Sequence, residues 1–245
     1  MFRQKRRSGM REVVIVDAVR TAIGKKKGAL SSVHPVDLLV PVLRALVDRN
    51  GLDAGLVEDV IVGCVTMTGE QGGNIARQAV LAAGFPVGVP AFSLNRMCGS
   101  SQQAIHSAAQ AILAGDIDIA IAAGVESMTR VPMGSDMGRF SRQLTSRYNI
   151  VPQGISAEMI AKKWGVSREE LDAFSLQSHE KAAAATDRGM FEREIIPLDV
   201  PGEEGTVSFT RDEGIGATRR LKSWRRSSRR SSRKMASLRP ATRVK

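Results

Sequence analysis

The feature that most constrains the fold is an alternation of strand-like and helix-like segments between residues 59 and 124. The short apolar runs DVIVGCV, AFSLN and DIDIAIAAG are separated by NIARQAVLAA and SSQQAIHSAAQAILA, which have helical spacing. Strands that alternate with helices at these distances are joined by crossover connections, and such connections build a layered α/β domain. An earlier apolar run, from Glu12 to Ala18, predicts a further buried strand.

Capping residues set the limits of the predicted elements. Pro35 stands near the start of an apolar helical run, Asn74 precedes a second one, and Ser167 with Glu170 has the pattern of a capping box. The run over 100–114 is apolar on more than half of its circumference, which suits a helix between two sheets. We expect helices at 34–49, 74–83, 100–114, 155–165 and 167–189, and strands at 12–18, 59–65, 91–95, 116–124, 191–200 and 206–214.

Composition divides the chain into four parts. Residues 1–9 form a basic extension that lacks the apolar region of a secretory signal. Residues 10–125 carry the strand and helix alternation, and we expect them to form the α/β domain. Residues 126–216 begin with a stretch rich in Ser, Met, Gly and Arg, and they are predicted to form a separate loop domain. Residues 217–245 are rich in Arg and Ser with few apolar side chains, so disorder is the physical expectation.

The positive charge belongs to the tail rather than to the body of the chain. The whole sequence has 36 basic and 25 acidic residues, and 12 of the basic ones lie in residues 217–245, which contain no acid. The formal charge of residues 1–216 is therefore −1. A nearly neutral body gives no reason to expect a specific nucleic-acid partner.

Apolar runs and cysteine spacing exclude several other classes of protein. No run approaches the ~20 residues that span a bilayer, so we expect no membrane partner. Cys64, Cys98 and three scattered histidines match neither a zinc-site spacing nor a C-x-x-C pair, and we expect no metal. The same two cysteines do not suggest a disulfide framework, which favours a reducing compartment, and we predict a cytoplasmic protein.

Cys98 is the strongest candidate for a catalytic residue. It follows a predicted strand and precedes a predicted helix by one or two residues, with Gly99 directly after it. Backbone N–H groups and the helix dipole stabilise a thiolate at such a turn, and thiolates there serve as nucleophiles. The residues alone leave open the alternative that Cys98 is a small buried hydrophobic side chain.

The other candidates favour structural roles. Cys64 lies within a strand-like run, which favours packing. His106 is two helical turns beyond Cys98, out of hydrogen-bond reach, so it does not serve as the base. His34 and His179 are expected to be structural or to face solvent. The glycine clusters GKKKG and GEQGGN match neither a phosphate-binding loop nor a dinucleotide fingerprint, and we interpret them as loops.

Three segments carry a resemblance to a known family. MREVVIVDAVRTAIGKKKGALSSVHPVDLL, VIVGCVTMTGEQGGNIARQ and NRMCGSSQQAIHSAAQAILAGDIDIAIAAGVESMTRVPMG resemble the amino-terminal half of the thiolases, acetyl-CoA acyltransferases of fatty acid metabolism. SREELDAFSLQSHEKAAAATDRGMFEREIIPL is similar to the loop domain of that family. The resemblance covers residues 10 to 215 and implies a thiolase-like αβα-layered domain with an inserted loop domain, the second thiolase half being missing.

The resemblance also implies a chemistry. Thiolases transfer acyl groups between CoA thioesters through a cysteine acyl-enzyme, and Cys98 aligns with that cysteine. The loop domain holds the CoA moiety. Many members carry His-Met-Gly where this chain has Pro152-Gln153-Gly154, so Gln153 is the predicted substrate-binding residue and its contacts to pantetheine are expected to differ. Acyl-CoA and CoA are the implied partners, no other cofactor is implied, and the intact family members form homo-oligomers.

The resemblance stops before a complete catalytic set is reached. In the family the histidine base, a second cysteine and an asparagine-held water lie in the second half, so we expect this chain alone to be inactive. In a back-translation of our own choosing, one base inserted after codon 215 makes the tail resemble the thiolase continuation, and a frameshift near residue 216 is our hypothesis for the tail. The alternative function is a non-catalytic module whose basic tail binds RNA or anionic surfaces.

Overall fold

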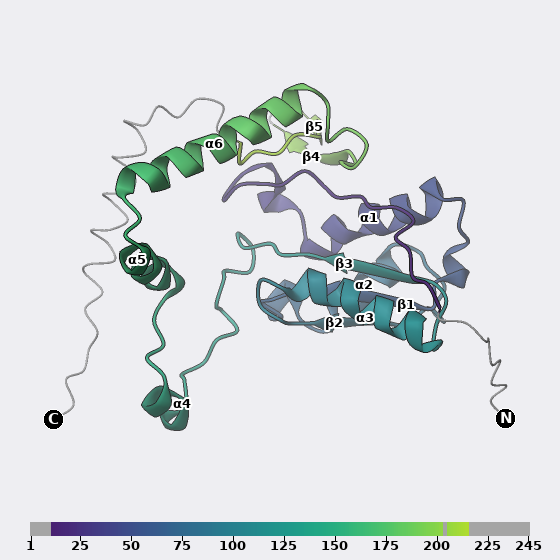
Figure 1. Ribbon diagram of the computed structural model, residues 1–245. Helices are drawn as coiled ribbons and strands as arrows, with labels where there is room; N and C mark the ends of the chain where they lie inside the picture. The colour runs from purple at the N-terminus through teal and green to yellow at the C-terminus, as the bar shows by residue number, and fades with distance from the viewer. Residues whose placement is uncertain (1–10, 203–204, 216–245) are drawn as a thin grey trace. The chain divides into compact units, whose positions relative to one another are not determined.

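A computed structural model describes residues 11–202 and 205–215 (Figure 1). The described residues form two units. The first contains residues 11–138 and 191–214, and the second contains residues 139–190. The predicted extension at 1–9 and the predicted tail at 217–245 lie outside the described residues. The domain limits at 125 and 216 stay a prediction.

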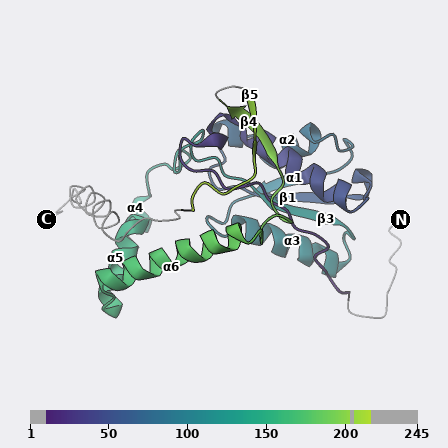
Figure 2. The ribbon, with the colours of Figure 1, turned by 90° about the horizontal axis from the view of Figure 1, so that it is seen from above.

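The first unit is built on a parallel sheet with helices on both faces. Its strands are β1 (Asp59–Gly63), β2 (Ala91–Leu94) and β3 (Ala120–Gly124), in the order β2-β1-β3. The helices α1 (Pro35–Arg49) and α2 (Ile75–Ala82) cover one face, and α3 (Ser100–Ala114) covers the other (Figure 2). The predicted αβα layering is confirmed. Short 3-10 turns lie at Ala29–Ser32, Ala54–Leu56 and Gly69–Gln71.

Alternating side chains of β1 distribute the core between the two layers. Val60 and Val62 are fully buried in a cluster with α1 and α2, whereas Ile61 points to the other face and packs with Ala104 and Ala108 of α3. This is the period-2 pattern of a strand that is covered on both faces. Small alanines on α3 leave room for the helix to lie close to the sheet.

The predicted caps form as expected. The side chain of Asn74 accepts a hydrogen bond from the Arg77 N–H at the start of α2, and α3 ends at Gly115 in a left-handed conformation with φ 82°. The backbone N–H of Val36 donates to Nδ1 of His34 at 3.2 Å, so this histidine caps α1. His34 therefore has the structural role that the sequence suggested.

The prediction of a buried strand over 12–18 is wrong for this structure. These residues form no ladder with any described strand, and Val14, Ile15 and Val16 are 73%, 77% and 78% exposed. The physical reason is that a strand needs a partner as well as an apolar pattern. Here Asp17 instead forms an ion pair with Arg49 at the end of α1, at 3.2 Å, and β3 remains an edge strand.

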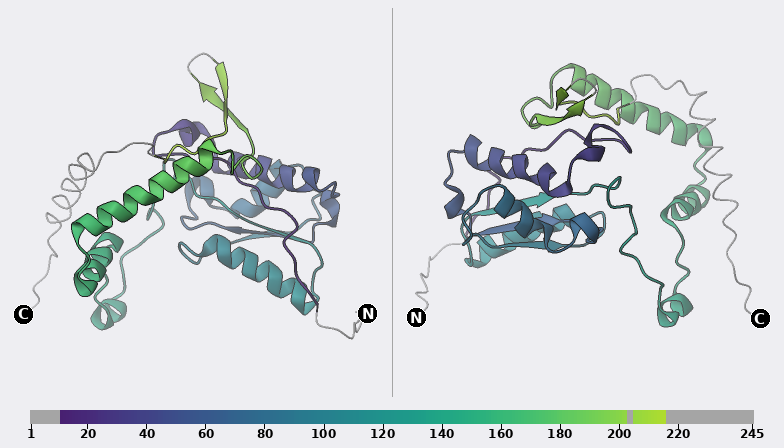
Figure 3. Two further views of the ribbon diagram at one scale, coloured as in Figure 1. Left: turned by 45° about the horizontal axis from the view of Figure 1, so that its top comes forward. Right: turned by 180° about the vertical axis from the view of Figure 1, so that it is seen from behind.

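The other five predicted strands are all shorter than expected, and three of them differ by several residues. Residues 116–119 precede β3 rather than belong to it, because the N–H of Ile119 donates to the Glu58 carboxylate at 3.1 Å. Residues 191–200 and 206–214 are represented by β4 (Leu198–Gly202) and β5 (Gly205–Phe209). These two strands pair antiparallel as a ribbon (Figure 3), and the buried side chains Val200 and Phe209 pack against Ala22.

The second unit is helical. It contains α4 (Arg142–Arg147), α5 (Gln153–Trp164) and α6 (Arg168–Asp187), so the predicted helices at 155–165 and 167–189 are confirmed and α4 is additional. The predicted capping box is present, since Ser167 and Glu170 exchange side-chain and backbone hydrogen bonds. No helix in the described part of the chain is long and apolar enough to cross a bilayer.

Candidate active site

Cys98 lies in the turn that joins β2 to α3. Its side chain is exposed, and Met97 before it has a left-handed backbone with φ 48°. A non-glycine residue rarely adopts this conformation, and such strain persists only where the surroundings hold it. Gly99 occupies the N-cap position of α3. The thiol therefore stands at the amino end of a 15-residue helix, where the helix dipole favours negative charge.

Two glycines of the sheet allow α3 to approach closely. A Cβ on Gly63, the last residue of β1, would lie 2.4 Å from the carbonyl carbon of Ser100. A Cβ on Gly124, the last residue of β3, would lie 1.8 Å from the hydroxyl of Ser101. Neither distance is sterically possible, so any larger residue would push the start of α3 away from the sheet. The absence of these side chains fixes the height of the Cys98 turn above the strands.

Hydrogen bonds hold both ends of the turn. The buried Ser100 hydroxyl accepts from the backbone N–H of Arg96 at 2.9 Å and donates to the carbonyl of Met97 at 2.6 Å. The Oδ1 atom of Asn95 accepts from the backbone N–H of Met97 at 2.8 Å. The guanidinium of Arg96 donates to Gln103 on the next turn of α3. The turn is thus defined by side chains from both sides of Cys98.

A second polar cluster lies beside this turn, at the carboxyl ends of β1 and β3. The carboxylate of Glu126 accepts from the backbone N–H groups of Val65 at 2.8 Å and Thr66 at 3.3 Å. It also accepts from the side-chain amide of Gln71 at 2.8 Å, and the Oε1 atom of Gln71 accepts from the Ser127 N–H at 2.6 Å. Gln71 is fully buried. Sequence reasoning missed these residues, because nothing in their local spacing marks them as partners.

Cys64 has the structural role that its position in a strand-like run suggested. Its side chain is 1% exposed and belongs to the core cluster of the sheet. Burial, with a smaller effect of the nearby Glu126 and Asp136 carboxylates, raises the pKa of the Cys64 thiol from 9.0 to about 12. The thiol is therefore protonated at neutral pH, and it is not a second nucleophile.

Neither histidine of the first unit is placed as a base for Cys98. His106 is exposed on α3, His179 is half-buried on α6, and His34 caps α1 with its Nε2 atom 4.0 Å from Glu70. Gln153 is the first residue of α5 in the second unit, where its side chain is exposed. Within the part of the chain that the structure describes, no group of three or more His, Cys, Asp or Glu side chains could hold a metal ion.

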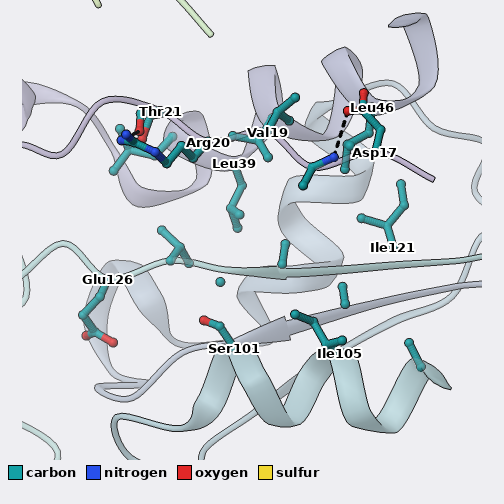
Figure 4. Close-up of a pocket in the computed structure, with 18 of the residues that line it drawn as sticks. Asp17, Val19, Arg20, Thr21, Leu39, Leu46, Ser101, Ile105, Ile121 and Glu126 are labelled. Atoms are coloured by element: carbon teal, nitrogen blue, oxygen red, sulfur yellow. Dashed lines mark hydrogen bonds between the residues drawn. The ribbon is translucent and has the colours of Figure 1, made fainter. Parts of the chain in front are cut away.

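A cavity in the first unit is a separate feature. It has a volume of about 1570 Å³, and it lies between the segment 12–26, α1, α3 and the open edge of β3. Leu39 and Leu46 face it from α1, and Ser101 and Ile105 face it from α3 (Figure 4). Cys98 is not among the lining residues. The cavity is mainly apolar, and it occupies the space beside β3 that the unpaired segment 12–18 leaves open.

Comparisons with known proteins agree with the resemblance seen in the sequence. Residues 13–227 match the family model "Thiolase, N-terminal domain". The chain is 46% identical over 218 residues to a steroid 3-ketoacyl-CoA thiolase of Mycobacterium tuberculosis, covering 84% of this chain and 53% of the relative. It is 46% identical over 219 residues to an acetyl-CoA acetyltransferase of Chromobacterium violaceum, covering 83% and 56%. The chain therefore spans about half the length of the curated relatives it matches.

A solved structure gives the same result. The acetyl-CoA acetyltransferase of Bacillus anthracis matches with a TM-score of 0.75 and 34% identity, over 94% of this chain and 59% of that protein. The expected fold class is confirmed. Nothing in these matches supports the alternative of a non-catalytic module with an RNA-binding tail, and the segment that it requires, residues 217–245, lies outside the described residues.

Proposed function

Because the chain belongs to the thiolase family, we propose that the whole protein transfers acyl groups between CoA thioesters and that Cys98 is its nucleophile. The observation that carries this proposal is the exposed thiol at the amino end of α3, in a turn held on both sides by hydrogen bonds. A cysteine that only packs in a hydrophobic core does not require an exposed turn that hydrogen bonds hold in place. Its buried counterpart, Cys64, shows the contrast within the same chain.

The proposed reaction has two steps. In the first, the Cys98 thiolate attacks the carbonyl carbon of an acyl-CoA, and the bond to the CoA sulfur breaks. The acyl group is then a thioester of Cys98, and CoA leaves as a thiol after taking up a proton. In the second, the α-carbon of another acyl-CoA loses a proton and attacks the same carbonyl carbon, which forms a carbon–carbon bond and releases Cys98. The reverse direction is thiolytic cleavage of a 3-ketoacyl-CoA.

Cys98 requires further groups for this chemistry. A base must remove the thiol proton, and hydrogen-bond donors must stabilise the oxyanion that forms at the carbonyl. Within the first unit, His34 caps α1 and His106 is exposed on α3, so neither is placed as that base. We infer that these groups belong to parts of the whole protein outside the described residues. Residue Gln153 remains our proposal for a contact to the pantetheine of CoA.

The same family membership supports proposals on the metabolic role, the location and the oligomeric state of the enzyme. The names of the relatives, acetyl-CoA acetyltransferase and 3-ketoacyl-CoA thiolase, support a role in fatty acid metabolism. Two unpaired cysteines are consistent with the reducing conditions of the cytoplasm, which is our proposed location. We also propose that the whole protein forms homo-oligomers.

Formation of the acyl-enzyme tests the proposal. The protein expressed with its complete natural gene is incubated with acetyl-CoA and digested, and the peptide that carries Cys98 is examined by mass spectrometry. We expect an acetyl group on Cys98, none on Cys64, loss of the adduct in Cys98→Ala and retention in Cys64→Ala. A wild-type protein that binds acetyl-CoA but leaves Cys98 unacylated would contradict the assignment.

A further inference from the structure

We propose that Asn95 is a positioning residue for the Cys98 thiol, and that it acts by holding Met97 in its left-handed conformation. This inference rests on the proposed function, since it concerns the orientation of the proposed nucleophile. Asn95 follows β2 directly and lies three residues before Cys98. Its side chain does not touch the thiol. It takes part in two hydrogen bonds, one with Met97 in the turn before Cys98 and one with Val65 after β1.

The first hydrogen bond compensates the strain at Met97. The backbone N–H of Met97 donates to Oδ1 of Asn95 at 2.8 Å, and Met97 has φ 48°. A side chain at a positive φ clashes with its own backbone, so a methionine reaches this conformation only with help from its surroundings. Met97 itself is 60% exposed, which means that core packing does not hold it. The side-chain carbonyl of Asn95 holds the N–H of Met97, while the Ser100 hydroxyl holds its carbonyl at 2.6 Å, so Asn95 supports the left-handed turn from the β2 side.

The second hydrogen bond fixes Asn95 to the sheet. Its Nδ2 atom donates to the backbone carbonyl of Val65 at 2.8 Å. Val65 is in turn held from its other side, because its N–H donates to the Glu126 carboxylate at 2.8 Å. The same carboxylate binds the side chain of the fully buried Gln71. A chain of contacts therefore runs from the buried cluster through Val65 and Asn95 to the turn before Cys98.

This arrangement explains why the carboxylate of Glu126 and the buried side-chain amide of Gln71 lie at this end of the sheet. A buried amide and a carboxylate cost free energy unless they are fully hydrogen-bonded, and here they bind backbone groups of the segments that follow β1 and β3. The result is a rigid base under the Cys98 turn. Without Asn95 the turn would relax toward negative φ at Met97, and the thiol would leave the amino end of α3.

The rate of alkylation of Cys98 tests the inference in the 245-residue chain. Iodoacetamide is added at pH 7, and the labelling of the two cysteine peptides is followed separately by mass spectrometry. We expect Asn95→Ala to slow the labelling of Cys98 about tenfold, because the reactivity of a cysteine depends on the hydrogen-bond donors and dipoles that face its sulfur, and the variant moves the thiol away from the amino end of α3. Cys64 should remain unlabelled in both proteins, which shows that the fold is intact.

Two further variants separate positioning from a general loss of structure. Glycine adopts a left-handed conformation at no steric cost, so the double variant Asn95→Ala with Met97→Gly should recover most of the wild-type rate. Asn50→Ala is the matched control, because Asn50 is also exposed and also donates to a backbone carbonyl, that of Leu46 at 2.7 Å. It should leave the rate unchanged.

The outcomes distinguish this inference from the proposed function. A wild-type alkylation rate in Asn95→Ala, or a slow rate that glycine at position 97 does not restore, overturns the positioning role. If the alanine variant labels Cys64 as well, its fold is loosened, and Asn95→Asp decides instead. Aspartate keeps the acceptor for Met97 but not the donor to Val65, so a slowing of about threefold is expected and no change overturns the inference. Absence of an acyl-Cys98 in the whole protein would overturn only the proposed function.

Discussion

The two cysteines show how position in the fold decides the chemistry of one residue type. Cys98 and Cys64 each lie in or after a strand, yet one is exposed at a helix start and the other is 1% exposed within the core. Burial next to Glu126 raises the pKa of the Cys64 thiol and keeps it protonated, whereas Cys98 is exposed to solvent at the start of α3. Of the two cysteines, only Cys98 is accessible to a substrate.

The raised pKa of Cys64 predicts a pH dependence of stability. The thiol has a pKa of 9.0 in the unfolded chain and about 12 in the folded one. Above pH 9 the unfolded state loses this proton and the folded state does not, so the unfolded state gains stability relative to the folded state. By pH 10 we expect a loss of about 1 kcal/mol in the free energy of unfolding.

Urea unfolding of the wild type and of Cys64→Ala at pH 7 and pH 10 measures this effect. Alanine at position 64 lacks the ionisable group, and although it lowers stability at both pH values, the additional loss at pH 10 should be smaller by about 1 kcal/mol. Lysine and tyrosine titrate equally in the two proteins and cancel in the comparison. An identical pH dependence in both proteins would show that the thiol is not shifted.

At the scale of elements, the position of α3 depends on residues that have no side chains. Gly63 ends the central strand β1 and Gly124 ends the edge strand β3, and both face the first turn of the helix. The alanines Ala104 and Ala108 continue this close contact along the helix. The sheet and the helix therefore meet at a distance that larger residues would not permit, and the Cys98 turn takes its height from that contact.

Gly63→Ala is expected to disturb this contact. The added Cβ would lie 2.4 Å from backbone atoms of Ser100 and Ser101, which cannot move independently of the helix. We expect a loss of about 2–3 kcal/mol in the free energy of unfolding, as for other overpacked cores, together with slower alkylation of Cys98. Thermal unfolding followed by circular dichroism measures the stability.

Gly88→Ala is the matched control for this prediction. Gly88 also lies in the first unit, and a Cβ at this position meets nothing within 4 Å. The substitution should leave both the stability and the alkylation rate within error of the wild type. Equal effects of the two substitutions would mean that the contact between β1 and α3 is not the cause.

At the scale of the whole molecule, the described residues form a framework that exposes the Cys98 thiol at the start of α3. The sheet, its two helical layers and the Cys98 turn are in place, and of the two histidines in the first unit His34 caps α1 and His106 is exposed on α3. The apolar cavity along the open edge of β3 is a second exposed feature of the first unit. Its apolar lining, together with the exposed side chains of Val14 to Val16, is the kind of surface that proteins usually cover.

We expect the 245-residue chain to cleave acetoacetyl-CoA no faster than the uncatalysed background reaction. Loss of one oxyanion donor alone typically lowers a rate by ~10²–10³, and here a base is absent from the described surroundings of Cys98 as well. Absorbance of the 3-ketoacyl-CoA measures the reaction. The same sample should be alkylated at Cys98, which shows that the thiol is accessible. Turnover that disappears in Cys98→Ala would mean that residues outside the described part supply a base.

The sequence by itself determined the layered α/β fold, the caps of its helices and the place of Cys98 at a helix start. These features depend on apolar periodicity and capping residues, which are patterns among residues close together in the sequence. The family resemblance added a predicted reaction, acyl transfer through a cysteine acyl-enzyme.

Only the tertiary structure decided the remainder. The segment 12–18 has the apolar pattern of a strand, but a strand also needs a hydrogen-bonded neighbour. The segment does not pair with the edge strand β3. Asn95 binds Val65, 30 positions earlier, and Glu126 binds the same residue from 61 positions later. Periodicity carries no information about such pairs, because they depend on the order of strands in the sheet and on which loops meet at its carboxyl edge.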